Sequence, residues 1–261
     1  MYQMFLSSLT VPEARQRFEI VTAWFLKLPL LVTQELKNLK VFSKGAYDVV
    51  TNVDYAVHNS FVECIKNNFR DDLIISEESL PVGHCEDFMH ILDPIDLTRN
   101  LGSRRTFFTL YCFRLKQKPQ FSIIQQFNPT KLFVATHQGL FNFDGSSWIK
   151  FSLTSQSSTI RWVKVEDYSI VDSSTSYQAI SSRQVFLDLA LGELDWFEYS
   201  KNGKWLAWDY APFIDMLHLL PYTEINVCPQ VLKNGYLNTS SNDSERNFVI
   251  KGNLVNDNQA N

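Results

Sequence analysis

The chain has 261 residues, of which 45% are hydrophobic, and its formal net charge is -4. This length and composition suffice for a large buried core, and we interpret residues 1–261 as one globular domain. The slightly acidic balance excludes a broad basic surface of the kind that binds nucleic acid or an anionic membrane.

Cysteine usage and hydropathy predict a cytoplasmic protein. The four cysteines show no Cys-x-x-Cys spacing, which argues against a disulfide framework and against a structural zinc site. The most apolar early segment, IVTAWFLKLPLLV, is interrupted by Lys27 and Pro29 and is shorter than the roughly 20 residues of a membrane span. We therefore expect a helix packed in the core, with neither an export signal nor a membrane anchor.

The first elements along the chain are predicted to be helices, followed by strands. Apolar residues over 11–39 recur at helical spacing on both sides of Pro29, which predicts one kinked helix or two short ones. An amphipathic pattern predicts a helix over 54–69. DLIIS and MHILD are typical of short buried strands that lead into acidic residues.

Hairpins and a second pair of helices are predicted next. TFFTLYCFRL and FSIIQQF should pair across the polar turn KQKPQ, and KLFVATHQGLFNFDGSSW should form a further hairpin. A helix over about 180–191 should end at Gly192. WDYAPFIDMLHLL should begin another helix, with Asp209 as its N-cap and Pro212 in its first turn. This alternation implies a layered mixed α/β fold.

The stretch ILDPIDLTRN carries the most informative acidic residues. Asp93 follows an apolar run, and the turn at Pro94 should bring Asp96 to the same side. Aspartates beside a proline are often only turn formers. However, two adjacent carboxylates repel each other unless a cation lies between them, and such oxygen ligands suit Mg²⁺ or Mn²⁺.

Two further features support a cation and phosphate site. ISEES places Glu77 at a strand end, and a Trp-Asp pair places Asp209 at a helix start. DLTRN is typical of a helix start, where the backbone N–H groups of Leu97 and Thr98 could hold a phosphate.

Four motifs, taken in order, resemble those of the inositol monophosphatase family, the lithium-sensitive, metal-dependent phosphatases that include the fructose bisphosphatases and the adenosine bisphosphate phosphatases. The motifs are KGAYDVVTNVD, SEES, DPIDLTRN and WDYAP. NPTKLFVATHQGLF, SSRQVFLDLALGELD and NFVIKGN are similar to the family's hairpin, late helix and last strand. The resemblance therefore covers nearly the whole chain and implies an αβαβα sandwich, with a metal-binding half over 1–150 and a second half over 151–261 that contributes Asp209.

The resemblance implies a two-metal site. Glu77, Asp93 and the backbone carbonyl of Ile95 would hold the first Mg²⁺. Asp93, Asp96 and Asp209 would hold the second. One ion would activate a water for in-line attack on phosphorus, and the other would steady the leaving oxygen. Trp208 is expected to pack beside these ligands.

Catalytic and substrate-binding roles follow from the same resemblance. The hydroxyl of Thr98, paired with Glu77, would orient the attacking water. Asp54 matches an acid associated with a further metal or its waters, and an aspartate that opens a helix is also often a cap. The backbone of Leu97 and Thr98 would cradle the phosphate.

Two other residues are candidates for contacts with the substrate. Ser181 aligns with a family serine near the substrate, and a serine at a helix start explains it equally well. Glu198 is the nearest candidate for the acid that touches sugar hydroxyls, against the alternative of a solvated loop acid. Arg99 belongs to a small basic cluster that could bind a second anionic group or form an exposed polar loop.

Some positions depart from the family pattern. Leu97 stands where the family has glycine, and a side chain there is costly if the backbone needs a positive φ. The Glu-x-Gly-Gly turn after the Trp-Asp pair is also missing. These departures motivate a catalytically weak or silent member that serves as a binding or regulatory module.

The expected function is an Mg²⁺-dependent phosphomonoesterase, with Mn²⁺ as an alternative ion, that acts on a small phosphate monoester such as an inositol monophosphate. Asn100 matches the Thr-x-Asn ending of the inositol-type members. A phosphatase for adenosine 3',5'-bisphosphate or a sugar bisphosphate remains an alternative, and a two-metal nuclease ranks lower because no basic, aromatic-lined track is present. Family members are commonly dimers, so a homodimer is also expected.

Overall fold

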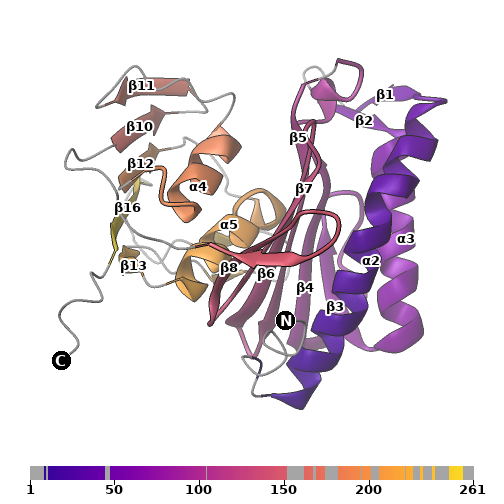
Figure 1. The fold of residues 1–261 in the computed structure, drawn as a ribbon. Coiled ribbons are helices and arrows are strands. Elements are labelled where there is room, and N and C mark those ends of the chain that lie inside the picture. Colours follow the sequence, from indigo (N-terminus) through magenta and orange to yellow (C-terminus); the bar gives the residue numbers. More distant parts are fainter. Residues whose placement is uncertain are drawn as a thin grey trace.

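The computed structural model describes residues 9, 11–44, 48–103, 105–151, 162–166, 169–173, 182–194, 196–200, 206–220, 222–225, 230–231, 237–238 and 247–254. Their elements form successive layers of two helices, a seven-stranded sheet, two more helices and a five-stranded sheet (Figure 1). The predicted layered α/β class is confirmed, and these are four of the five layers expected. The division into halves at residue 150 stays a prediction.

The first layer consists of α2 (Pro12–Leu36) and α3 (Asn52–Asn68). Helix α2 is a single helix that continues through Pro29, so the alternative of two short helices is wrong. A small hairpin of β1 (Val41–Ser43) and β2 (Val49–Thr51) joins the two helices. Thr51 is the N-cap of α3 and accepts hydrogen bonds from the N–H groups of Val53 and Asp54. The hairpin and this cap fix the position at which α3 begins.

The seven-stranded sheet has the order β3-β4-β5-β6-β7-β8-β9. The strands are β3 (Asp72–Ser76), β4 (Cys85–Asp96), β5 (Phe107–Leu115), β6 (Lys118–Phe127), β7 (Lys131–Thr136), β8 (Gly139–Phe143) and β9 (Trp148–Lys150). Strands β3 and β4 are parallel, whereas the later pairs are antiparallel. Because β3 and β4 run in the same direction, the acidic residues at their carboxyl ends emerge at one edge of the sheet.

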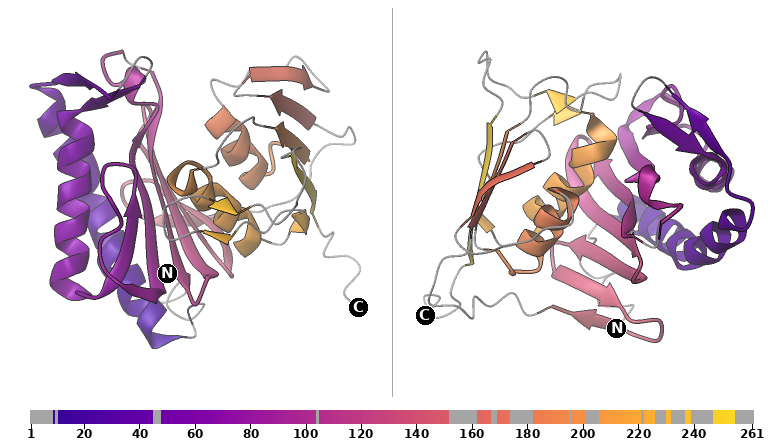
Figure 2. Two further views of the ribbon diagram at one scale, coloured as in Figure 1. Left: turned by 180° about the vertical axis from the view of Figure 1, so that it is seen from behind. Right: turned by 90° about the horizontal axis from the view of Figure 1, so that it is seen from above.

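Each face of this sheet has its own hydrophobic core. Along β5, Phe107, Tyr111 and Phe113 pack against α2 and α3, while Phe108 and Leu110 pack on the opposite face. That alternation is the two-residue period of a strand buried on both sides. The second core contains α4 (Ser182–Ala190) and α5 (Ala207–Leu219), which lie between the two sheets (Figure 2).

The five-stranded sheet has the order β11-β10-β12-β16-β13. Its strands are β10 (Trp162–Glu166), β11 (Ser169–Ser173), β12 (Trp196–Ser200), β13 (Tyr222–Ile225) and β16 (Asn247–Leu254), and β14 (Gln230–Val231) pairs separately with β15 (Leu237–Asn238). Within the described ranges, no helix is long and apolar enough to cross a membrane.

The start of α5 differs from the prediction. Leu206, in extended conformation, is the N-cap, so the helix begins before Asp209 and the prediction of Asp209 as N-cap is wrong. Asp209 instead lies in the first turn, where a carboxylate is favourable at the positive end of the helix dipole. Pro212 lies inside the helix, and its carbonyl accepts a 2.6 Å hydrogen bond from Ser122 Oγ. The end of α4 is as predicted, since Gly192 follows it with a φ of 74°.

Candidate functional site

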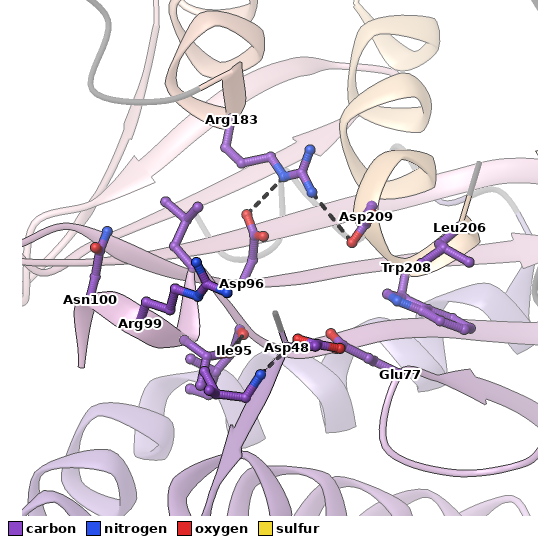
Figure 3. A pocket seen from close by; sticks show the side chains of 13 residues that line it. Asp48, Glu77, Ile95, Asp96, Arg99, Asn100, Arg183, Leu206, Trp208 and Asp209 are labelled. Atoms are coloured by element: carbon purple, nitrogen blue, oxygen red, sulfur yellow. Dashed lines mark hydrogen bonds and ion pairs between the residues drawn. The ribbon is translucent and has the colours of Figure 1, made fainter. Parts of the chain in front are cut away.

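A pocket of about 560 Å³ lies where β3 and β4 end and α4 and α5 begin (Figure 3). Both halves of the chain contribute to its walls. The lining residues are Asp48, Val49, Glu77, Ile95, Asp96, Leu97, Thr98, Arg99, Asn100, Arg183, Leu206, Trp208 and Asp209. Trp208 thus lies beside the acidic residues, as the sequence predicts.

Asp93 is the most deeply buried acid beneath this pocket. It is 1% exposed, and neither of its carboxylate oxygens has a hydrogen-bond partner among the residues described. Burial raises its pKa well above the ordinary value, and the negative charges of Glu77, Asp96 and Asp209 add to that effect. A buried carboxylate without partners is costly, so this site fits a cation that binds Asp93 directly.

Three acids from distant parts of the sequence converge here. Asp93, Asp96 and Asp209 each offer a carboxylate oxygen, and these oxygens all lie within 4.8 Å of one another. The structure therefore brings together the three side chains expected at the second metal position. Carboxylate oxygens are the ligands that Mg²⁺ and Mn²⁺ prefer, and the metal-binding role of these acids stays a prediction.

Arg183 is the residue that sequence reasoning missed. It extends from the first turn of α4, and its Nε donates to Asp96 Oδ2 at 2.9 Å while its Nη2 lies 3.3 Å from Asp209 Oδ1 (Figure 3). Its guanidinium carbon also lies 4.7 Å from the centre of the Tyr210 ring. An arginine in a helical pattern is ordinarily a solvated surface residue, so SSRQVF carries no signal of this contact.

Glu77 follows β3 directly and faces the pocket from the side opposite Arg183. Lys44 Nζ lies 3.0 Å from Glu77 Oε1 and 2.7 Å from Glu78 Oε1. Burial raises the pKa of Glu77 to about 8; Lys44 opposes this rise, and the charges of Glu78 and Asp209 add to it. Burial lowers the pKa of Lys44, but the two glutamates outweigh this effect, so Lys44 remains charged.

Thr98 does not make the contact expected of it. Its Oγ1 lies 3.1 Å from Asp54 Oδ1 and 2.8 Å from the Ile95 carbonyl, so the expected pairing with Glu77 is replaced by one with Asp54. Asp54 also caps α3, because its Oδ2 accepts from the N–H of Thr51 at 2.9 Å. Burial raises the pKa of Asp54. Asp54 is therefore both a helix cap and the partner of Thr98.

Leu97, which stands where the family has glycine, has a left-handed backbone conformation. Its φ is 64° and its ψ is 43°, immediately before a short 3-10 helix, Thr98–Asn100. The side chain is half-buried and packs against both hydrophobic cores. The loop thus keeps a conformation that glycine adopts easily, although a leucine occupies it.

The substrate-binding roles of Ser181 and Glu198 stay predictions. Ser181 lies outside the described residues. Glu198 lies within β12, where it is in register with Lys164 of β10 and Val249 of β16, so its prediction as a loop residue is wrong. WFEYS does not alternate apolar and polar residues strictly, so the local pattern did not distinguish this central strand from a loop.

The fold and this pocket define a layered α/β protein whose buried carboxylates suit a divalent cation. A family model described as the inositol monophosphatase family matches residues 15–212. The chain belongs to the inositol monophosphatase family.

Curated relatives match over only part of their length. The Nus factor SuhB of Salmonella typhimurium is 33% identical over 95 residues, which cover 36% of this chain and 36% of that protein. The chloroplastic phosphatase IMPL1 of Arabidopsis thaliana is 40% identical over 67 residues, or 25% of this chain and 18% of that protein. The chain thus spans about a third or less of these two relatives.

Solved structures match along most of the chain. An inositol monophosphatase family protein from Staphylococcus aureus has a TM-score of 0.66 at 18% identity, and the match covers 91% of each chain. A dual-specific IMPase/NADP phosphatase bound to D-inositol-1-phosphate has a TM-score of 0.67 at 19% identity, and the match covers 92% of this chain and 91% of that one. At these identities the likeness establishes the shared fold.

Proposed function

We propose that the protein is an Mg²⁺-dependent phosphomonoesterase that hydrolyses a small phosphate monoester such as an inositol monophosphate. The observation that carries this proposal is Asp93, a buried carboxylate whose two oxygens have no hydrogen-bond partner among the described residues and which lies close to Asp96 and Asp209. Membership of the inositol monophosphatase family supports phosphatase chemistry in general. Mn²⁺ is an alternative ion for the same oxygen ligands.

Glu77, Asp93 and the carbonyl of Ile95 would hold the divalent cation. When bound, that ion would supply positive charge that makes a water more acidic and that neutralises charge on the phosphate. Glu77 would bind the ion in its ionised form, and because its pKa is about 8 in the ion-free fold, ion binding would release a proton near neutral pH. Lys44 would hold Glu77 in place through their 3.0 Å contact.

The phosphate would lie over the turn at Leu97. The backbone N–H groups of Leu97 and Thr98 would contact its oxygens, since N–H groups at the start of a helix have no acceptor within that helix. Thr98 is held by Asp54 and by the Ile95 carbonyl, so its contacts would orient this turn relative to Asp93. The pocket volume of about 560 Å³ suits a sugar-sized or nucleotide-sized substrate.

Substitution of Asp93 tests this function directly. With Asp93→Asn, we expect the rate of phosphate release in Mg²⁺ to fall by more than roughly 100-fold. Removal of a residue that only hydrogen-bonds to a metal ligand typically costs roughly 10- to 100-fold, and Asp93 would be a ligand itself. Release of inorganic phosphate should be measured with inositol phosphates, fructose bisphosphate, adenosine bisphosphate and NADP. The substrate with the highest kcat/KM would identify the class.

The matched control is Asp87→Asn, which is the same change at an exposed position of the same strand. Its rate should equal that of the wild-type protein. A wild-type rate for Asp93→Asn, or no release from any substrate by the wild-type protein, would contradict the proposal.

One observation favours a second function, that of a catalytically weak or silent member acting as a binding module. Arg183 contacts Asp96 and Asp209, two of the carboxylates expected to bind metal. Calorimetric titration with Mg²⁺ or Mn²⁺ separates the two functions, because the absence of binding at millimolar metal would favour the silent module.

A further inference from the structure

Arg183 places a permanent positive charge beside Asp96 and Asp209, two of the three clustered aspartates. Its Nε and Nη2 contact Asp96 Oδ2 at 2.9 Å and Asp209 Oδ1 at 3.3 Å, so one guanidinium bridges the end of β4 and the first turn of α5. The side chain of Arg183 is 5% exposed, and the side chains of Asp96 and Asp209 are 8% and 13% exposed. Arginine does not lose its proton in proteins, so this cation is present at every pH at which the protein folds.

The guanidinium is held from more than one side. Its carbon lies 4.7 Å from the centre of the Tyr210 ring, and Tyr210 follows Asp209 in α5. A planar guanidinium over an aromatic ring gains a cation–π attraction that increases when water is excluded. Arg183 is therefore fixed by a carboxylate from each half of the chain and by a buried ring, and it would lose all three contacts if it left the pocket.

This position conflicts with a second divalent ion. Mg²⁺ needs carboxylate oxygens at about 2.0–2.1 Å that point directly at it. In this structure, Asp96 and Asp209 direct oxygens to the arginine. A divalent ion between them would also lie next to a buried positive charge in surroundings that screen charges poorly.

Asp93 contrasts with those two acids. It lies at the base of the cluster, and none of the side chains described donates a hydrogen bond to it. Glu77 lines the pocket on the side away from Arg183, so one cation position, at Asp93 and Glu77, remains accessible to a divalent ion (Figure 3).

We propose that Arg183 is the resident cation at one of the two cation positions, so that the site binds a single divalent ion at Asp93 and Glu77 while the guanidinium faces the substrate phosphate. Arginine binds phosphate oxygens through its planar fork of N–H groups, so it supplies the charge that a second ion would supply. The inference deepens the proposed function and rests on it for the role of the phosphate. The number of bound ions can be measured whether or not the protein hydrolyses a substrate.

The test counts Mn²⁺ ions bound to the protein at saturation, by electron paramagnetic resonance of free Mn²⁺ and by calorimetric titration. We expect one ion on the wild-type protein and two on Arg183→Met, because methionine keeps most of the side-chain volume and releases Asp96 and Asp209. Arg99→Met is the matched control, since Arg99 lines the same pocket. It should bind one ion.

The counts decide the proposal in either direction. Two ions on the wild-type protein would overturn it, and so would one ion on a folded Arg183→Met variant. If Arg183→Met does not fold, the number of ions on the wild-type protein still tests the proposal. Arg183→Lys is then the second variant; it keeps a positive charge and should bind one ion. Two ions on the lysine variant would also overturn the proposal.

A phosphate-release assay on the same samples keeps this inference distinct from the proposed function. One ion on the wild-type protein and two on Arg183→Met, without turnover of any substrate, would support the resident cation and contradict the phosphatase. Turnover with two ions on the wild-type protein would support the phosphatase and overturn the resident cation.

Discussion

At the scale of single residues, Leu97 shows how a side chain can offset a strained backbone. The left-handed conformation costs a residue with a Cβ about 1–2 kcal/mol relative to a right-handed one. Leu97 adopts it with φ 64° and packs its half-buried side chain against both cores. Because each buried methylene contributes about 0.8 kcal/mol, this packing is large enough to offset the backbone cost.

Two substitutions at Leu97 separate these effects. We expect Leu97→Gly to be more stable than Leu97→Ala by about 1 kcal/mol, because both lose the packing and only glycine relieves the backbone. At an ordinary helix position alanine is the more stable of the two, so the reversed order is diagnostic. Urea unfolding of both variants gives the difference. Equal stabilities, or a more stable alanine variant, would show that position 97 is not left-handed.

The candidate site could be predicted from the sequence where local pattern defined it. Asp93, Asp96 and Asp209 were found because each follows an apolar strand or opens a helix, and the structure brings them together. Arg183 and the Thr98–Asp54 contact could not be found, because they depend on which way a side chain points across the fold. Sequence spacing carries no information of that kind between separate elements.

At the scale of elements, a buried ion pair fixes α2 on the seven-stranded sheet. Arg17 in α2 donates to Asp72 at the start of β3 through Nε at 2.6 Å and Nη2 at 2.7 Å. His90 of β4 lies 2.9 Å from the same carboxylate, and the Arg17 guanidinium lies 3.9 Å from the centre of the Phe88 ring. The contacts of Arg17 and His90 hold the pKa of Asp72 below its usual value despite burial.

Removal of Arg17 should therefore destabilise the protein strongly. We expect Arg17→Met to lower the free energy of unfolding by about 3–5 kcal/mol, because the Asp72 carboxylate stays buried without its main partner. Urea unfolding followed by circular dichroism measures this change. Arg15→Met, an exposed position of the same helix, should change stability by less than about 0.5 kcal/mol. Similar losses in both variants would rule out a special role for the buried pair.

Element types were predictable, and their ends were less so. The apolar runs of β3 and β4, the hairpin patterns of β5 to β8 and the helical period of α2 and α3 are local, so the sequence predicted those elements. The turn between β5 and β6 was predicted as KQKPQ, but it is confined to Lys116 and Gln117, which have φ values of 50° and 65°. Pairing with β5 extends β6 back to Lys118, into a polar stretch that local propensity assigns to a loop.

At the scale of the whole molecule, the site joins the two halves of the chain. Glu77 and Asp93 come from the edge of the seven-stranded sheet, and Asp209 comes from the helical layer behind it. A bound cation would therefore stabilise the assembled fold, since the unfolded chain has no preformed site. The raised pKa values of Glu77 and Asp93 make this stabilisation depend on pH.

We expect Mg²⁺ to raise the melting temperature more at pH 8 than at pH 6. The ion-free fold keeps protons on these carboxyl groups that the unfolded chain releases, so ion-free stability falls as pH rises from about 4.5 to about 8. Mg²⁺ binds the ionised form and therefore counteracts this loss. At 100 times its dissociation constant, one ion adds about 2.7 kcal/mol, which corresponds to about 5–10 °C. Differential scanning calorimetry at both pH values measures the shift.

Asp93→Asn provides the control for this effect. The ion-free variant should melt at a higher temperature than the wild-type protein at pH 8, because a buried charge and its repulsion with Glu77 are removed. It should also lose the shift caused by Mg²⁺. An equal Mg²⁺ shift in the variant would mean that the ion binds elsewhere.

The distribution of the site over both halves also has a consequence during synthesis. On the ribosome, the strands that carry Glu77, Asp93 and Asp96 emerge first, and α4 and α5 follow later. A nascent chain that ends before α4 therefore exposes the strand-end acids to water without the arginine that later contacts Asp96. Translation order thus delays assembly of the complete acidic site until α4 and α5 reach the sheet.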